Sequence, residues 1–158
     1  DVLPVSSPDE ALKDADIVTT MTTSTKPVFD GRSLDPAKPT HINAMGQHDP
    51  WAREVDEHVV LGSWIIVDEW EEAMAEHGEL LIPINKGLMR PSRIYGELGQ
   101  VVAGELPGRP QEGLNWTLFV SGGTGIEDVA VATKLYERAR ELGVGTEFEI
   151  DQDYRFEL

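Results

Sequence analysis

The chain has 158 residues, of which 40% are hydrophobic, and this is enough for one folded domain of ordinary size with its own core. Its 29 acidic residues outnumber 13 basic ones, and the resulting net charge of -16 argues against nucleic acids and anionic membrane surfaces as partners. The absence of cysteine excludes disulfides, thiolate catalysis and cysteine-bound zinc.

The acidic residues are spread along the chain rather than gathered in a tail. This distribution predicts a halophilic source, because salt screens the mutual repulsion of the charges. An ordinary acidic mesophilic protein is the alternative. Apolar runs are short, as at 64–67, and no charged-then-apolar leader is visible. We therefore expect a cytoplasmic protein that has no membrane segment.

Helical patterns and short apolar runs alternate in the first half of the chain. Ser7 is a capping residue followed by Pro8 and two acids, which predicts a short helix that ends near Ala15. The further elements predicted here are a strand over Ile17–Met21, a strand over Thr40–Met45, a helix over Ala52–Leu61, a strand over Trp64–Asp68 and a helix over Glu69–His77 that stops at Gly78.

The same alternation continues in the second half. The predicted elements are a helix over Pro91–Gly104 that is offset by Gly96 and Gly99, a loop over 105–114, a strand over Asn115–Val120, a long helix over Ile126–Leu142 and a last strand over Thr146–Ile150. Strands that alternate with helices predict an α/β fold with a doubly wound, mainly parallel sheet.

The loop after the second predicted strand is the first candidate site. Open α/β sheets bind ligands at the carboxyl ends of their strands, and here an apolar strand runs into Gly46 and a polar, proline-broken loop. Gly46 would let the backbone approach a flat ligand closely. Gln47, His48 and Asp49 supply hydrogen bonds and one group that titrates near neutrality.

A glycine cluster follows the fourth predicted strand, at Ser121 to Gly125. Its free N–H groups lie before a long helix and favour an anion, so a phosphate cradle is one reading. The third glycine of the dinucleotide fingerprint is missing, and Asp128 in the first turn would repel a phosphate. A simple tight turn with a capped helix is therefore the other reading.

Other site chemistries find less support in the spacing. His41, His48, Asp49 and Glu54 could form a metal set, but no pair has a typical zinc spacing, so we predict no metal. His58 and His77 lie on predicted helices, and we expect both to be solvated. No G-x-S-x-G elbow is present for a Ser-His-Asp hydrolase.

Several motifs, taken in order, resemble the ornithine cyclodeaminase and mu-crystallin family. They are ADIVTTMTTSTKPVF, INAMGQHDPWAREVD, LLIP, GELGQVVAGELPGR and TLFVSGGTGIEDVAVATKLYERARELGVGT, and they cover residues 15 to about 150. The family joins a Rossmann NAD(P)-binding domain to a substrate and dimerisation domain. The resemblance implies that residues 1–150 are the latter half of a Rossmann domain and that 151–158 return toward the other domain. The family's glycine fingerprint and its substrate-binding Lys and Arg would lie upstream, so we expect a C-terminal fragment.

The resemblance also implies which residues meet the ligands. Thr22 matches a threonine that contacts the cofactor, which is NAD or NADP in this family. The segment Met45, Gly46, Gln47 and His48 matches the loop that passes the nicotinamide, and Ser121 matches a serine beside it. The implied substrate is a small amino or imino acid, and the implied assembly is a homodimer.

Two positions depart from the ornithine cyclodeaminases. Their loop carries an aspartate that handles substrate protons, and here that position is His48, with Asp49 one place later. Ala52 replaces a lysine of the same loop. Either His48 or Asp49 is then the expected acid or base. The pattern is more similar to alanine-dehydrogenase-like and imine-reducing members, which implies an amino or imino acid oxidoreductase that transfers a hydride at the α-carbon. A cyclodeaminase that uses NAD catalytically, and a crystallin-like protein that binds nucleotide without chemistry, are the alternatives.

Overall fold

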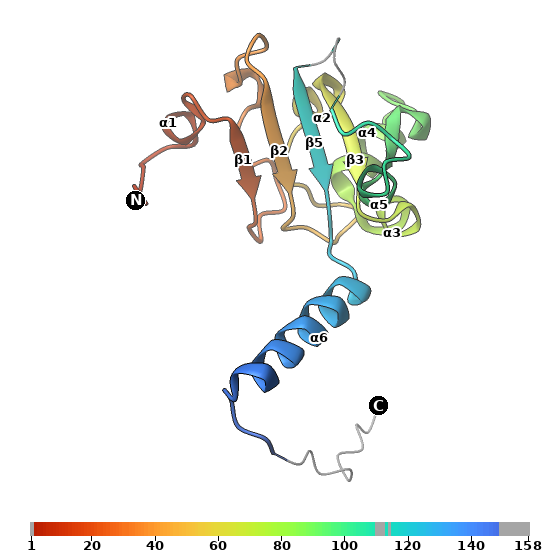
Figure 1. Cartoon of the computed structure of the whole chain (residues 1–158). Coiled ribbons are helices and arrows are strands. Elements are labelled where there is room, and N and C mark those ends of the chain that lie inside the picture. Colours follow the sequence, from red (N-terminus) through yellow and green to blue (C-terminus); the bar gives the residue numbers. More distant parts are fainter. Residues whose placement is uncertain (1, 110–112, 114, 149–158) are drawn as a thin grey trace, which may run out of the picture. The chain divides into compact units, whose positions relative to one another are not determined.

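The computed structural model describes residues 2–109, 113 and 115–148. Its centre is a five-stranded sheet in the order β1-β2-β5-β3-β4 (Figure 1). The strands are β1 (Ile17–Thr20), β2 (Thr40–Ala44), β3 (Ser63–Val67), β4 (Ile94–Glu97) and β5 (Trp116–Val120). All the strand pairs are parallel, which confirms the predicted α/β class and the strands predicted near residues 17, 40, 64 and 115.

The register places the ends of neighbouring strands at one level. In the central strand β5, Val120 pairs with Ala44 of β2 on one side and with Val67 of β3 on the other. Thr20 of β1 in turn pairs with Ala44. The loops that follow β1, β2, β3 and β5 therefore start side by side at the carboxyl edge of the sheet.

The core lies on one face of the sheet. Ile42, Ile65 and Leu118 are almost completely buried there. They pack with apolar residues of two helices, among them Val59 of α2 (Glu57–Gly62) and Leu80 of α4 (Gly78–Asn85). Residues in β2 alternate between buried and half-buried, as the two-residue period of a strand requires. The opposite face of β2 is thus polar and partly open.

Three α-helices begin at a side chain that caps the first turn. Ser7 accepts the Glu10 N–H (3.2 Å) before α1 (Pro8–Leu12). Asp56 accepts the Val59 N–H (3.0 Å) before α2, and Glu69 accepts the Glu72 N–H (3.0 Å) before α3 (Trp70–Glu76). These bonds satisfy N–H groups that have no partner inside the helix.

Two sequence predictions about helices were wrong in part, and one helix was not predicted. The helix expected over Ala52–Leu61 begins only at Glu57, because Asp56 caps it. The helix expected over Pro91–Gly104 is split into a 3₁₀ turn (Pro91–Arg93), strand β4 and α5 (Leu98–Val102), because Ile94 pairs with Ile65 at the sheet edge. Sheet pairing here overrides the helical spacing. Helix α4 was not expected at all, since Gly78 had been read as a stop.

Gly78 starts α4 for a steric reason. A Cβ atom at this position would lie 1.9 Å from the Ala52 carbonyl oxygen and 2.8 Å from that of Asp49. The glycine thus lets the loop after β2 lie directly on the start of the helix. The same residue type that ends helices elsewhere is needed here for close packing.

Helix α6 (Gly125–Leu142) was correctly predicted, and it belongs to a second compact unit that begins at Thr124. The Glu127 side chain accepts the Thr124 N–H (3.2 Å), and Gly143 ends the helix in the left-handed conformation (φ 63°). Residues 146–148 are not a strand, whereas the remainder of that predicted strand and the tail 151–158 lie outside the described residues. The domain boundary near 150 stays a prediction.

No helix in the described part of the chain is long and apolar enough to cross a membrane.

Candidate functional site at the carboxyl edge

The carboxyl edge brings together the residues that the sequence singled out from three distant segments. The Met45 N–H bonds to the Thr20 carbonyl (3.0 Å), and the Ser121 N–H bonds to the Ala44 carbonyl (3.1 Å). These bonds extend the sheet by one residue into each loop. Ser121 is 3% exposed, and its placement next to the β2 loop agrees with the predicted grouping.

Gly46 has a packing role that the sequence did not predict. A Cβ atom here would lie 2.4 Å from the Thr22 carbonyl oxygen and 2.6 Å from Glu54 Oε1. The space that the glycine leaves is therefore filled by the protein itself and not by a ligand. Gly46 is required because the loop after β1 passes directly against it.

Glu54 holds these two loops together. Its Oε1 accepts the Thr22 N–H (2.5 Å), and its Oε2 accepts the Gly46 N–H (2.8 Å). The residue has no exposed surface. We call this arrangement the Glu54 clamp. Sequence reasoning considered Glu54 only as a metal ligand and missed this role.

Asp68, which follows β3, holds the glycine turn after β5. Its Oδ2 accepts the N–H groups of Gly122 (3.0 Å) and Gly123 (3.2 Å). Gly123 also donates to Ser121 Oγ (3.1 Å) and has a left-handed backbone (φ 79°). Because a carboxylate of the protein already takes these N–H groups, the tight turn is the better reading of the cluster, and the phosphate cradle is not supported.

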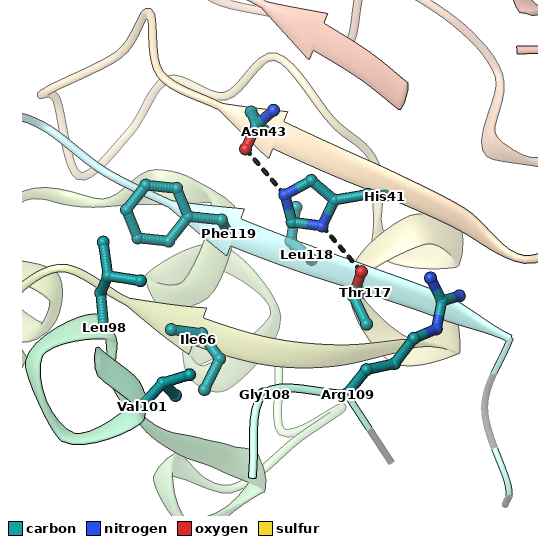
Figure 2. Close-up of a pocket in the computed structure, with 10 residues that line it drawn as sticks. All are labelled: His41, Asn43, Ile66, Leu98, Val101, Gly108, Arg109, Thr117, Leu118 and Phe119. Atoms are coloured by element: carbon teal, nitrogen blue, oxygen red, sulfur yellow. Dashed lines mark hydrogen bonds between the residues drawn. The ribbon is translucent and has the colours of Figure 1, made fainter. Parts of the chain in front are cut away.

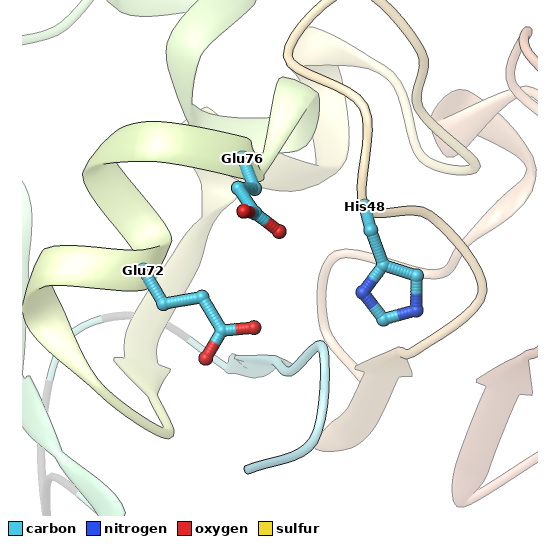
Figure 3. Close-up of side chains that lie close together, drawn as sticks. All are labelled: His48, Glu72 and Glu76. Carbon is cyan, nitrogen blue, oxygen red and sulfur yellow. The ribbon is translucent and has the colours of Figure 1, made fainter. Parts of the chain in front are cut away.

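His48 lies beside two carboxylates of α3. A ligand atom from each of His48, Glu72 and Glu76 falls within 4.8 Å of the others, and Figure 3 shows both glutamates reaching from the helix toward the imidazole. Gly122 makes this possible, because a Cβ there would lie 2.7 Å from both His48 Nδ1 and Glu72 Oε1. The donors are of a kind that can bind a divalent cation or exchange protons with a substrate.

The electrostatics of the cluster favour a retained proton. Burial, and then the negative charges of Asp68 and Glu76, raise the pKa of the Glu72 carboxyl above its usual value of 4.5. Neighbouring carboxylates disfavour each other's ionised form, so the group gives up its proton at a higher pH than an isolated glutamate. A carboxyl whose pKa is raised in this way is one of the kinds of group found at functional sites.

His77 lies next to this cluster and is buried in the protein interior. The prediction that it is solvated was wrong: it has no exposed surface, and its ring centroid is 6.4 Å from that of His48. Burial lowers the pKa of its imidazole, so the neutral form is favoured. His58 on α2 is exposed, as predicted.

Asp49 is exposed, and its Oδ1 accepts the Trp51 N–H (2.8 Å). This is an Asx turn, which shapes the loop before Ala52. The structure therefore gives Asp49 a local structural role, and its predicted catalytic role stays a prediction.

A separate pocket of about 500 Å³ lies on the half-open face of the sheet (Figure 2). His41 forms hydrogen bonds to Thr117 Oγ1 (2.7 Å) and Asn43 Oδ1 (2.9 Å) in its wall, and Leu98 and Val101 of α5 line the other side. None of the predicted site residues lines this pocket. His41 lines this pocket, whereas Glu54 does not, and His48 groups instead with Glu72 and Glu76.

The acid that follows β3 and the two acids of α3 were not predicted as site residues, although one signal was present. Asp68 follows an apolar strand directly, which is the position where α/β sheets place ligand-binding side chains. Glu72 and Glu76 lie one helical turn apart and so share one side of α3. Their proximity to His48 depends on the strand order and could not be read from spacing.

A family model confirms the resemblance drawn from the motifs. The model of the ornithine cyclodeaminase/mu-crystallin family matches residues 1–143. The chain belongs to this family. Among curated relatives, a Δ1-pyrroline-2-carboxylate reductase of Bacillus cereus is 40% identical over 143 residues, which are 90% of this chain and 43% of the relative.

Solved structures agree in fold. The Δ1-pyrroline-2-carboxylate reductase of Thermococcus litoralis, solved with NADH and L-proline, has a TM-score of 0.82 and 38% identity over 91% of this chain and 44% of that one. An archaeal alanine dehydrogenase dimer with bound NAD has a TM-score of 0.79 and 32% identity over 94% of this chain and 45% of that one. The fold is thus Rossmann-like, as predicted, and the chain spans about 43% of the length of its curated relatives.

Proposed function

We propose that the chain is part of an NAD(P)-dependent oxidoreductase that transfers a hydride at the α-carbon of a small amino or imino acid, with reduction of a cyclic imine as the leading reaction. The observation that supports this most is the 38% identity, over 91% of the chain, to a protein solved with NADH and L-proline. The 40% identity to a second Δ1-pyrroline-2-carboxylate reductase points the same way.

The residues at the carboxyl edge fit this chemistry. A bound nicotinamide would supply or accept the hydride. The Ser121 hydroxyl, the Thr22 loop and the Met45–His48 loop lie at adjacent strand ends, where α/β sheets bind cofactors. Their arrangement supports a cofactor-binding role for Thr22, Met45, Gly46, Gln47, His48 and Ser121.

Imine reduction also needs a proton. When hydride adds to the carbon of the C=N bond, the nitrogen takes a proton, and the product is the saturated amine. His48 is the proposed donor because its ring lies at the edge and its side chain is exposed to an incoming substrate. Glu72, whose pKa is raised, is placed within 4.8 Å to return a proton to His48.

The proposal also covers assembly. We expect the full-length protein to form a homodimer, which is supported by the alanine dehydrogenase dimer among the structural neighbours. Its cytoplasmic location and its adaptation to salt stay predictions.

The test uses the full-length product of this reading frame. Δ1-pyrroline-2-carboxylate with NADH or NADPH should be reduced, with loss of absorbance at the nicotinamide wavelength and formation of proline. His48→Ala should lower kcat by about 100-fold or more, the range for a lost general acid. The matched control is His58→Ala, which changes an exposed histidine of α2 and should leave the rate unchanged.

A parallel assay with ornithine and NAD separates the alternatives. Proline formed without net NADH would make the protein a cyclodeaminase. No turnover in either assay, together with cofactor binding, would favour the crystallin-like alternative. An unaffected His48→Ala enzyme would remove His48 from the mechanism.

A further inference from the structure

Glu54 is unusual because it is a fully buried acid whose carboxylate bonds to main-chain groups. Neighbouring Arg53 pairs with Glu57 (2.9 Å) and not with Glu54. The Glu54 carboxylate instead accepts the N–H groups of Thr22 and Gly46. Burial of an acid is costly unless its charge is satisfied, and two main-chain donors satisfy it here.

The backbone of Glu54 is held as firmly as its side chain. Its N–H donates to Glu79 Oε1 (2.9 Å) at the start of α4, and its carbonyl accepts the Val28 N–H (2.8 Å). One residue therefore joins the loop after β1, the loop after β2, the segment at Val28 and helix α4. The four contacts leave the carboxylate little freedom to move.

The two carboxylate oxygens set the spacing between the two loops. Each oxygen takes one N–H, so the distance between Thr22 N and Gly46 N is limited by the size of one carboxyl group. Gly46 allows this approach because it has no side chain on the Thr22 side. The loops are 24 residues apart in the chain, and Figure 1 shows that β1 and β2, from which they emerge, lie next to each other.

We propose that Glu54 is a positioning residue that fixes the gap between the Thr22 loop and the Met45–His48 loop, and thereby the site for the nicotinamide cofactor. This inference rests on the proposed function, in which both loops contact the cofactor. A shift of about 1 Å in such a site can cost about 100-fold in rate. Glu54 itself touches main-chain groups and is not a catalytic residue.

The test compares Glu54→Gln with Glu57→Gln in the full-length protein. The glutamine at position 54 presents an NH₂ group to one of the two N–H donors, so one loop must lose its bond. Amide hydrogen exchange should rise in residues 20–24 or 44–48, or in both, whereas the turn at 122–123, which Asp68 holds, should stay protected. The dissociation constant for NADH or NADPH should rise by about tenfold or more.

Glu57→Gln makes the same chemical change three residues later, in a side chain that is paired on the surface. It should change neither the exchange of the two loops nor the cofactor dissociation constant. If Glu54→Gln does not fold, Glu54→Asp keeps the charge but is one methylene shorter, so it cannot reach both donors and should give the same pattern in milder form.

The outcomes separate the clamp from a purely structural role. A higher cofactor dissociation constant and KM together with loosened loops would support the proposal. Loosened loops with unchanged cofactor affinity and KM, or loops that stay protected, would overturn it. If the wild-type protein binds neither cofactor, the proposed function fails first, and the hydrogen-exchange comparison still decides whether Glu54 holds both loops.

Discussion

Two carboxylates at the same sheet edge bind main-chain N–H groups, two at Glu54 and three at Asp68, but they connect different parts of the chain. Glu54 is fully buried and joins Thr22 to Gly46, which lie on separate loops. Asp68 is half-buried and binds Gly122 and Gly123, which are consecutive. The first carboxylate sets the distance between two segments, whereas the second shapes one turn. We therefore expect changes at the Glu54 clamp to cost more than equivalent changes at Asp68.

The largest difference in stability should come from replacing the glycine next to each carboxylate, Gly46 at Glu54 and Gly122 at Asp68, by alanine. Gly46→Ala would bring a Cβ to 2.4 Å from the Thr22 carbonyl oxygen, and main chain cannot easily move. We expect a loss of about 3 kcal/mol in the free energy of unfolding, the range for overpacking. Gly122→Ala would meet the ends of the His48 and Glu72 side chains, which can rotate. It should cost less than about 1 kcal/mol, and it should lower activity by displacing His48. Urea unfolding of both variants measures the difference, and equal losses would break the comparison.

Asp68→Asn should lower the free energy of unfolding by a moderate amount. The amide oxygen can still accept the N–H groups of Gly122 and Gly123, but the NH₂ group then faces the Glu69 N–H, which donates to Asp68 Oδ1 (2.8 Å) in the wild-type protein. We expect a loss of about 1 kcal/mol, as for a single lost hydrogen bond. The pKa of Glu72 should fall as well, because the charge of Asp68 helps to raise it. A carboxyl titration by NMR checks this second effect, and an unchanged Glu72 titration would contradict it.

Glu79→Gln tests the acid that accepts the Glu54 N–H. Burial raises the pKa of Glu79 above its usual value of 4.5, so its ionised form is disfavoured in the folded protein. Wild-type stability should therefore decrease as the pH rises above about 4.5, and the glutamine variant should lack this loss. The variant should therefore become more stable relative to wild type as the pH rises from acid to neutral. Unfolding curves at several pH values measure it. A stability difference between the two proteins that does not change with pH would contradict this prediction.

Glu57→Gln should lower the free energy of unfolding least. Arg53 and Lys86 lower the pKa of Glu57 to about 2. The ion pair therefore stabilises the fold above the unfolded pKa of about 4.5, and this contribution is lost as the pH falls toward 2. Because the pair lies near the surface, we expect a loss of only about 0.5–1 kcal/mol at neutral pH. The wild-type and variant curves should converge at low pH, and a loss comparable to that of Gly46→Ala would be unexpected.

Much of the fold was accessible from local patterns. The apolar runs predicted β1, β2, β3 and β5, and the capping residues with the spacing of apolar side chains predicted α1, α3 and α6. Strand β4 and helix α4 were missed. Ile94 pairs with Ile65 in the sheet, and the helix that begins at position 78 needs a glycine there because Ala52 lies against it. Both depend on a neighbour that is distant in the chain.

Only some residues of the candidate site could likewise be predicted from the sequence. Thr22, His48 and Ser121 were identified by their motifs, and the register of β1, β2 and β5 brings their loops to one edge. Glu72 could not be predicted as a neighbour of His48. Its approach to His48 depends on the position of β5 between β2 and β3, and on the space that Gly122 leaves. Gly46 was singled out, but the close approach of the Thr22 loop that requires a glycine there was not predicted.

The sequence by itself determined the α/β class, the family and the loops that carry the candidate site, because these depend on periodicity, capping and ordered motifs that are local in the chain. Only the tertiary structure decided what each polar side chain does. Glu54 and Asp68 are both acids next to polar loops, yet burial and the strand order make one a link between two loops and the other the support of a turn. Hydrogen-bond partners across a sheet edge are set by register, and register is a property of the folded chain.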